Sequence, residues 1–167
     1  EGGVEIERPM DLRPRRCPNW LHRQSYWFMP VALLGTEQYD VHDVELTTLA
    51  MGRADGVGGW VAPQTGRPLP CPRYRDLTSP AEPCDCQVLP RDGLTDLALH
   101  FRTSELVSEL ELNDLPRGVT VELVLTGAMA DGTPFIAVDC VKVTGHPESM
   151  RSLRRWQQPP HPRWHRR

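Results

Sequence analysis

Long apolar runs are missing from this sequence of 167 residues, since no stretch of eighteen apolar residues occurs. We therefore predict that the chain has no transmembrane helix. Two motifs of well-known chemistry are also missing: the G-x-S-x-G turn of hydrolases and the C-x-x-C-H motif that attaches haem. The five cysteines do not form the two close pairs that a zinc ribbon or finger needs. Because no catalytic constellation stands out, we predict that the protein is not an enzyme.

Proline is abundant instead, with 17 residues in 167, about twice the usual share of roughly 5%. Proline lacks a backbone N–H and breaks helices, so long helices are not expected. Apolar residues make up 39% of the chain and charged residues 25%, which leaves enough apolar content for a folded core. The composition therefore predicts a folded, helix-poor protein.

The net charge of −3 conceals two parts of opposite sign. Residues 148–167 hold six arginines and one acid, whereas the rest of the chain is strongly acidic. A basic tail of this kind favours contact with an acidic protein face or an anionic membrane surface, and a solvated terminus is the alternative. Nucleic acid is not expected, because the body is acidic. The tail residues that we expect to bind a partner are Arg151, Arg154, Arg155, Trp156, Arg163 and Trp164.

Disulfides are the predicted role of the five cysteines, which are Cys17, Cys71, Cys84, Cys86 and Cys140. One pairing joins Cys17 to Cys140, and Cys71 then pairs with Cys84 or Cys86, although spacing alone leaves the connectivity open. Cys84 and Cys86 point the same way in an extended chain, so they are not expected to pair with each other. The odd count leaves one thiol free or bonded to another chain.

Disulfides imply an oxidising compartment, so we predict an extracytoplasmic location, whether secreted, periplasmic or at the cell surface. The chain begins with Glu1 rather than Met, as a processed secreted chain would, although a trimmed chain would look the same.

Short strands are predicted where apolar residues alternate with polar ones or form short continuous runs. These strands lie at 4–7, 10–14, 31–35, 44–51, 97–101, 119–125 and 134–143. A D-G turn at Asp131-Gly132 between the last two predicts a β-hairpin, and the alternation slips near Asp139-Cys140, which predicts a bulge. A short helix is expected next to the strand at 97–101, with Thr103 or Ser104 as its N-cap.

The fold class that these elements predict is mainly β: an antiparallel β-sandwich with one short helix and a long proline-rich loop at 61–90. Residues 1–9 are expected to form a leader that can add an edge strand. Residues 10–145 form the β-sandwich domain, and residues 146–167 form the basic Arg/Trp tail.

An unusually aromatic segment, Tyr26, Trp27 and Phe28, precedes the apolar strand at 31–35. Either these side chains pack in the core, or they form an exposed apolar patch that docks on a partner. We take the three residues as candidate partner-binding residues.

Several short motifs occur together in an order that resembles a β-rich module of secreted bacterial proteins. The module's pattern is I-D-I-K-P-G-S-C-P-N, then L-P-V-A-I-L-G-T, and later D-G-T-P-F-x-x-x-D-C. The matching stretches here are Met10-Asp11-Leu12-Arg13-Pro14 with Cys17-Pro18-Asn19, residues 29–36, Cys84-Asp85-Cys86, and residues 131–140. The resemblance covers about residues 10–143 and implies an extracellular β-rich unit without an assigned activity.

The resemblance also implies a calcium loop of the form D-x-N-x-D-G-x-x-D, of which only Asp92 and Asp96 remain as acids here. Calcium takes six to eight oxygen ligands, so this loop alone is a poor site. Further aspartates in loops would complete a site if they converged at one end of a sandwich, whereas the alternative is that they serve local turns. The candidate calcium ligands are Asp40, Asp43, Asp92, Asp96 and Asp131.

These features predict a non-enzymatic extracytoplasmic structural or binding subunit that docks in a larger assembly through residues 26–29 and the basic tail. A calcium-dependent adhesion or carbohydrate-binding module is the alternative function. No cofactor other than calcium is expected.

Overall fold

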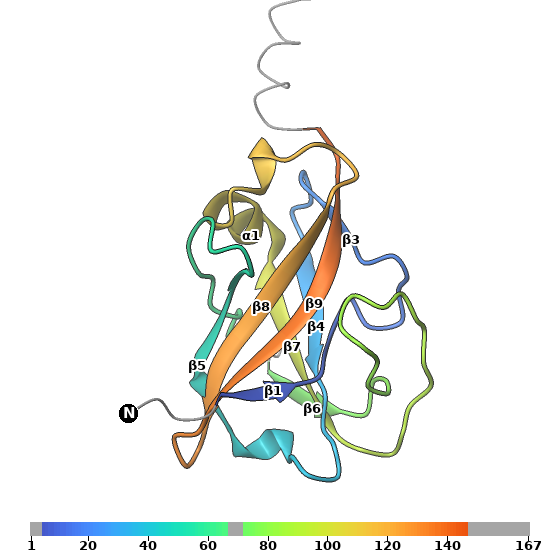
Figure 1. Ribbon diagram of the computed structural model, residues 1–167, viewed down its shortest axis with the longest axis vertical. Coiled ribbons are helices and arrows are strands. Elements are labelled where there is room, and N and C mark those ends of the chain that lie inside the picture. Colours follow the sequence, from blue (N-terminus) through green and yellow to red (C-terminus); the bar gives the residue numbers. More distant parts are fainter. Residues whose placement is uncertain (1–4, 67–71, 147–167) are drawn as a thin grey trace, which may run out of the picture.

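The computed structural model describes residues 5–66 and 72–146, which fold into two β-sheets packed against each other. Figure 1 shows the first of these, sheet A, in front of the second, sheet B. Sheet A has the strand order β1 Ile6–Arg8, β9 Pro134–Thr144, β8 Thr120–Met129 and β5 Val44–Arg53, and β3 Trp20–His22 also pairs with β9. Sheet B has the strand order β2 Met10–Leu12, β4 Phe28–Leu33, β7 Asp96–Arg102 and β6 Arg73–Arg75.

The predicted mainly-β sandwich is confirmed, with one correction to the pairing. Strands β1 and β3 both run parallel to β9, one after the other along the same edge, whereas the other pairs are antiparallel. Parallel strands cannot be joined by a tight hairpin, and β1 and β3 both lie far from β9 in the sequence. Between β1 and β3 the chain passes through β2 in the other sheet. The N-terminal leader therefore supplies an edge strand, as the sequence pattern predicts, but in parallel orientation.

The helical elements are short, as the proline content predicts. They are the α-helix α1 Thr103–Glu109 and the 3₁₀ turns η1 Val41–Asp43 and η2 Leu112–Asp114. The predicted N-cap at Thr103 or Ser104 is wrong: Arg102 occupies the cap position without a side-chain hydrogen bond, and the Thr103 N–H donates to the Trp27 carbonyl at 3.1 Å. No helix in residues 5–66 and 72–146 is long and apolar enough to cross a membrane.

The β8–β9 hairpin is formed as predicted, with Gly132 at a φ of 88° in its turn, a value that glycine adopts without steric cost. The predicted bulge at Asp139-Cys140 is wrong. Pairing runs without a break from Thr120 opposite Lys142 to Ala128 opposite Pro134. Asp139 interrupts the apolar pattern because it is a polar side chain at an inward-facing position, and the register itself does not slip.

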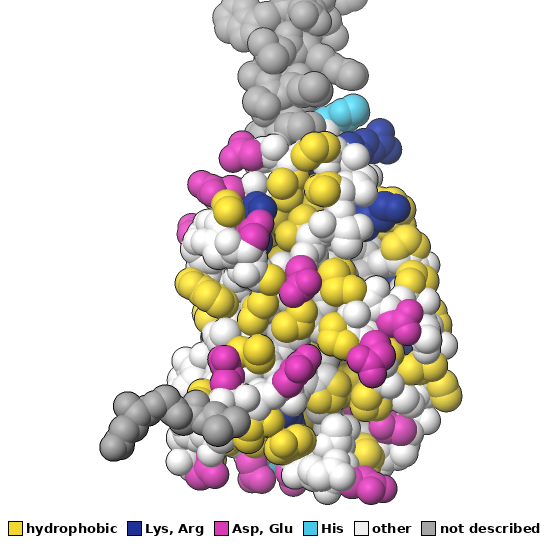
Figure 2. Space-filling view, viewed as in Figure 1, with side chains coloured by type: hydrophobic (Ala, Val, Ile, Leu, Met, Phe, Trp, Pro, Cys, Tyr) yellow, Lys and Arg dark blue, Asp and Glu magenta, His cyan; other side chains and the backbone are white. Residues whose placement is uncertain are grey.

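The core lies between the sheets and contains alternate residues of the longer strands, as a sandwich requires. Its members include Met29, Val31 and Leu33 from β4, Leu97, Leu99 and Phe101 from β7, Leu123 and Leu125 from β8, and Phe135, Val141 and Val143 from β9. Alternation leaves Pro30 and Ala98 on the outer face of sheet B. Figure 2 views the outer face of sheet A, on which the visible charged side chains are mainly acidic.

Candidate binding surface

The aromatic segment is divided between surface and interior. Tyr26 is 83% exposed and Trp27 is 62% exposed, whereas Phe28 is only 7% exposed. Phe28 opens β4, where the Arg102 guanidinium lies 5.0 Å above its ring and Trp27 meets it edge-on at 5.7 Å. Phe28 is therefore a packing residue and not a free partner-binding residue. We call Tyr26 and Trp27 the aromatic patch.

The backbone beneath the aromatic patch is held by hydrogen bonds to its neighbours. The Trp27 carbonyl accepts from the Thr103 N–H, and the Trp27 N–H donates to Ser25 Oγ at 3.2 Å. The Ser25 N–H donates to the His22 carbonyl at 3.0 Å. The two rings are thus displayed from a segment anchored to both β3 and α1. Anchoring lowers the entropy that would be lost when a partner covers the rings.

A cavity of about 320 Å³ lies beside Tyr26, and we call it the patch cavity. Its wall is rich in hydroxyl and amide groups, from Gln24, Ser25, Ser104, Ser108 and Asn113. Arg23 also lines it but is 5% exposed, because its guanidinium donates to the carbonyls of residues 112, 115 and 145. Arg23 therefore has a structural role in the wall of the cavity, and the hydroxyl and amide groups around it are the groups that can hydrogen-bond to a ligand.

The described part of the chain contains two disulfides, Cys17–Cys86 and Cys84–Cys140, so the predicted pairing of Cys17 with Cys140 is wrong. Their Cα–Cα distances are 5.3 Å and 4.8 Å. Cys84 and Cys86 bond to different partners because Cys84 has a left-handed φ of 64° and the chain turns there. Cys71 lies outside the described residues. Two disulfides are typical of a protein that works in an oxidising compartment.

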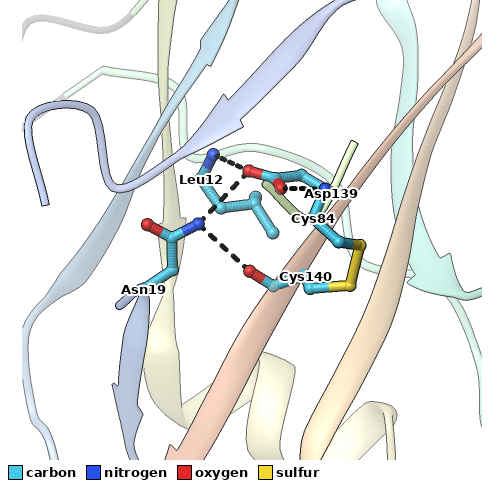
Figure 3. The surroundings of a disulfide bond; sticks show 5 residues. All are labelled: Leu12, Asn19, Cys84, Asp139 and Cys140. Atoms are coloured by element: carbon cyan, nitrogen blue, oxygen red, sulfur yellow. Dashed lines mark hydrogen bonds between the residues drawn. A yellow bond between two sulfur atoms is a disulfide. The ribbon is translucent and has the colours of Figure 1, made fainter. Parts of the chain in front are cut away.

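Asp139 organises the polar contacts around the second disulfide (Figure 3). Its Oδ2 accepts from the Leu12 N–H at 2.8 Å and from Asn19 Nδ2 at 3.2 Å, and its Oδ1 accepts from the Cys84 N–H at 3.1 Å. The carboxylate is 5% exposed and lies where the β9 edge is free between β1 and β3. Burial raises the pKa of Asp139, and the donated hydrogen bonds oppose that rise.

Asp11, on strand β2 of the other sheet, has a carboxyl whose pKa is strongly raised. Burial, and then the negative charge of Asp139, raise the pKa of Asp11 from 3.8 to about 7. Within the described residues Asp11 has no hydrogen-bonding partner for its carboxyl, whereas Asp139 has three. Of the two carboxyls, Asp11 is therefore the one that takes up a proton first as the pH falls.

We expect Asp11→Asn to stabilise the protein at pH 8 by about 2 kcal/mol, after allowance for solvent screening of a half-buried group. The folded pKa lies above the unfolded one. The contribution of Asp11 to the stability of the wild type is therefore fully present below pH 4 and is lost as the pH rises through 7. The asparagine variant does not lose it. Urea unfolding at pH 5 and pH 8 measures the difference, and Asp114→Asn is the matched control, because Asp114 is exposed and its carboxyl has no hydrogen bond within the described residues. An equal effect of D11N at both pH values would contradict the assignment.

The candidate calcium ligands are only partly brought together. Asp40, Asp43 and Asp131 line one cavity of about 330 Å³ at the end of the sandwich. Asp40 Oδ1 already accepts from the His42 N–H at 2.9 Å, and Asp131 Oδ1 accepts from the Thr133 N–H at 2.9 Å. These hydrogen bonds lower the pKa of both carboxyls. Both are therefore charged, and both also serve local turns.

The other two candidate ligands lie elsewhere. Asp96 is fully buried and accepts from the backbone N–H groups of Gly35, Leu77 and Thr78, at 3.0, 2.8 and 3.2 Å. Asp92 lies in the loop before β7. Among the described residues, metal-ligating atoms gather only at Cys84, Glu122 and Cys140, and the two sulfurs there are bonded to each other. Calcium binding stays a prediction.

The remaining predicted partner-binding residues are those of the basic tail. Arg151, Arg154, Arg155, Trp156, Arg163 and Trp164 lie outside the described residues. Comparison with protein-family models, curated proteins and solved structures finds no match to this chain. The resemblance to a secreted bacterial module therefore stays a prediction from the quoted motifs.

Proposed function

We propose that the protein is a non-enzymatic extracytoplasmic binding subunit that docks on a protein partner through the aromatic patch, with the basic tail as a second contact. The observation that carries the proposal is the exposure of Tyr26 and Trp27 on an anchored backbone. Tyrosine and tryptophan are the residues most often found at the energetic centre of protein interfaces. Exposure of two adjacent aromatic rings to water is unfavourable in free energy unless a partner covers them.

The location is the second part of the proposal. One disulfide joins the loop before β3 to the loop before β7, and the other joins the loop before β7 to strand β9. Such bonds persist where thiols are oxidised. The polar wall of the patch cavity suits a partner side chain that enters beside Tyr26 and hydrogen-bonds there. The acidic face over β8 and β9 in Figure 2 makes that side of the molecule a poor surface for anionic partners.

The double variant Tyr26→Ser/Trp27→Ser is expected to weaken partner binding at least tenfold, because the two rings are the buried centre of the interface. The measurement is recovery of partners from native cells on the tagged full-length protein, followed by affinity titration with the purified partner. Trp60→Ser is the matched control, since Trp60 is 54% exposed and lies in another loop. Partner recovery that is unchanged by the double variant would remove the proposal.

A second candidate function, carbohydrate binding, is favoured by the combination of an exposed aromatic ring and a cavity lined by hydroxyl and amide groups. It differs from the first in its ligand. A glycan array with and without millimolar calcium distinguishes the two. Glycan binding that is lost in the same double variant would show that the ligand is a carbohydrate and not a protein. A calcium requirement would support the aspartates at 40, 43 and 131 as calcium ligands.

A further inference from the structure

The outer face of sheet B carries a cavity of about 400 Å³ with an apolar floor. Pro30 of β4, Ala98 of β7 and Leu77 from the segment after β6 form part of this floor. Ala98 faces away from the core because Leu97 and Leu99, on either side of it, belong to the core between the sheets. The cavity is thus on the side of sheet B that sheet A does not cover.

Four arginines surround this floor, and they come from three separate segments. Arg15 lies between β2 and β3, Arg73 and Arg75 lie on β6, and Arg91 lies between β6 and β7. Arg73 and Arg75 share one side of β6 because side chains alternate along a strand. All four are exposed, and within residues 5–66 and 72–146 none of them forms an ion pair with a carboxylate.

The fold fixes the two loops that carry Arg15 and Arg91. The Cys17–Cys86 disulfide joins these loops, with Arg15 two residues before Cys17 and Arg91 five residues after Cys86. Arg15 has a left-handed φ of 68°, a conformation that is uncommon for residues other than glycine. The backbone positions from which Arg15 and Arg91 reach the cavity are therefore set by the fold and its cross-link.

Acidic groups near the cavity do not neutralise these arginines. The Asp76 carboxylate accepts from two backbone N–H groups of the loop before β7, at 3.4 Å and 2.8 Å. Asp96 is buried and engaged with backbone N–H groups as described above. His100 lines the cavity as well, and burial followed by the charge of Arg73 lowers its pKa, so it is neutral at pH 7. The nearby acidic groups thus bond to the backbone, and within the described residues the four guanidiniums have no carboxylate partner above the apolar floor.

We propose that this arginine-rimmed cavity binds an amphipathic anion, a small molecule whose anionic head lies on the guanidiniums and whose apolar body covers the floor. Guanidinium groups match carboxylate and phosphate oxygens in paired hydrogen bonds, which is stronger than attraction by a point charge. Apolar surface on the ligand gains by leaving water at the floor. Like charge excludes the chain's own basic tail as the occupant. The inference is independent of the aromatic patch.

Titration calorimetry on the full-length oxidised protein tests the proposal with four probes: octanoate, octyl phosphate, octanol and acetate. We expect at least one of the two amphipathic anions to bind more than tenfold tighter than octanol, which lacks the charge, and than acetate, which lacks the apolar body. The tighter of the two anions identifies the head group. Equal binding of octanol, or no heat from either anion at millimolar concentration, would overturn the inference.

Variants of the rim and of the floor locate the site. Arg73→Gln/Arg91→Gln is expected to reduce affinity for the better anion at least tenfold, because both guanidiniums contact its head. Arg16→Gln/Arg117→Gln removes the same charge from two exposed arginines outside the cavity and should change the affinity less than twofold. Ala98→Ile fills the floor and should reduce binding without a change of charge, with Ala98→Val as the smaller alternative. Equal losses in the rim and control pairs would show general charge attraction and refute the site.

Discussion

Removing the Cys84–Cys140 disulfide is expected to lower the free energy of unfolding by about 4 kcal/mol, the value that the loop-entropy relation gives for a closed loop of this size. The two cysteines are 56 residues apart in the sequence. The bond also holds the Cys84 N–H against Asp139, which would otherwise lose one of its donors. A small sandwich with a free energy of unfolding of roughly 5–15 kcal/mol would lose a large share of its stability.

Urea unfolding of Cys84→Ser/Cys140→Ser under non-reducing conditions measures this loss. Cys71→Ser is the matched control, because the two disulfides leave Cys71 without a cysteine of the same chain to pair with. We expect the control to change stability by less than about 0.5 kcal/mol. Two results would contradict the prediction: equal midpoints for the double variant and the control, or titration of five free thiols in the native protein.

Local features of the fold were predictable from sequence because they depend on neighbouring residues. The β8–β9 hairpin follows from alternating residues on both sides of Asp131-Gly132, and the short helix α1 follows from the polar residues after β7. Long-range pairing was not predictable in this way. The parallel placement of β1 and β3 along one edge of β9 depends on how the chain crosses between sheets, which no local pattern records.

The cysteines also show that local features are predictable from sequence whereas long-range pairing is not. Five cysteines in a proline-rich chain predict disulfides, yet the partner of each depends on the turn at Cys84, where a left-handed residue sends two nearby cysteines in different directions. In an extended chain Cys84 and Cys86 would point the same way. For the aromatic segment the sequence left two alternatives open, packing in the core or exposure to a partner. The structure divides the segment, with Tyr26 and Trp27 exposed and Phe28 buried, and no local pattern predicts that division.

The arginine-rimmed cavity was missed for a related reason. Its only sequence signal is the R-Y-R alternation at 73–75, which places two arginines on one side of a strand but says nothing about the loops that approach it. Buried carboxylates were missed as well. In the sequence Asp96 resembles a loop aspartate and Asp139 resembles a break in the alternation of a strand, but each accepts more than one backbone N–H group in the structure.

Asp139→Asn is expected to destabilise the protein by about 2 kcal/mol, because the loss of an acceptor outweighs the relief from removing the buried charge whose burial raises the pKa of Asp139; this is the opposite of the effect of Asp11→Asn. An asparagine has one acceptor oxygen in place of two, so its amide N–H₂ would face the N–H of Leu12 or of Cys84. A buried donor would then lack an acceptor, and a hydrogen bond to a charged group would be lost as well. The same substitution on β2 and on β9, which face each other from the two sheets, should thus change the free energy of unfolding in opposite directions.

Equilibrium unfolding of D139N, D11N and the double variant at pH 8 measures both effects and their coupling. Because the charge of Asp139 raises the pKa of Asp11, D139N should also lower the pKa of Asp11, which a carboxyl NMR titration follows directly. Asp114→Asn is again the control for an exposed carboxylate. A neutral or stabilising D139N would mean that the buried charge is not held by its donors, and an unmoved Asp11 titration would mean that the two carboxyls do not interact. The joint result therefore tests whether the two carboxyls interact at the seam between the two sheets and whether the charge of Asp139 is held by its donors.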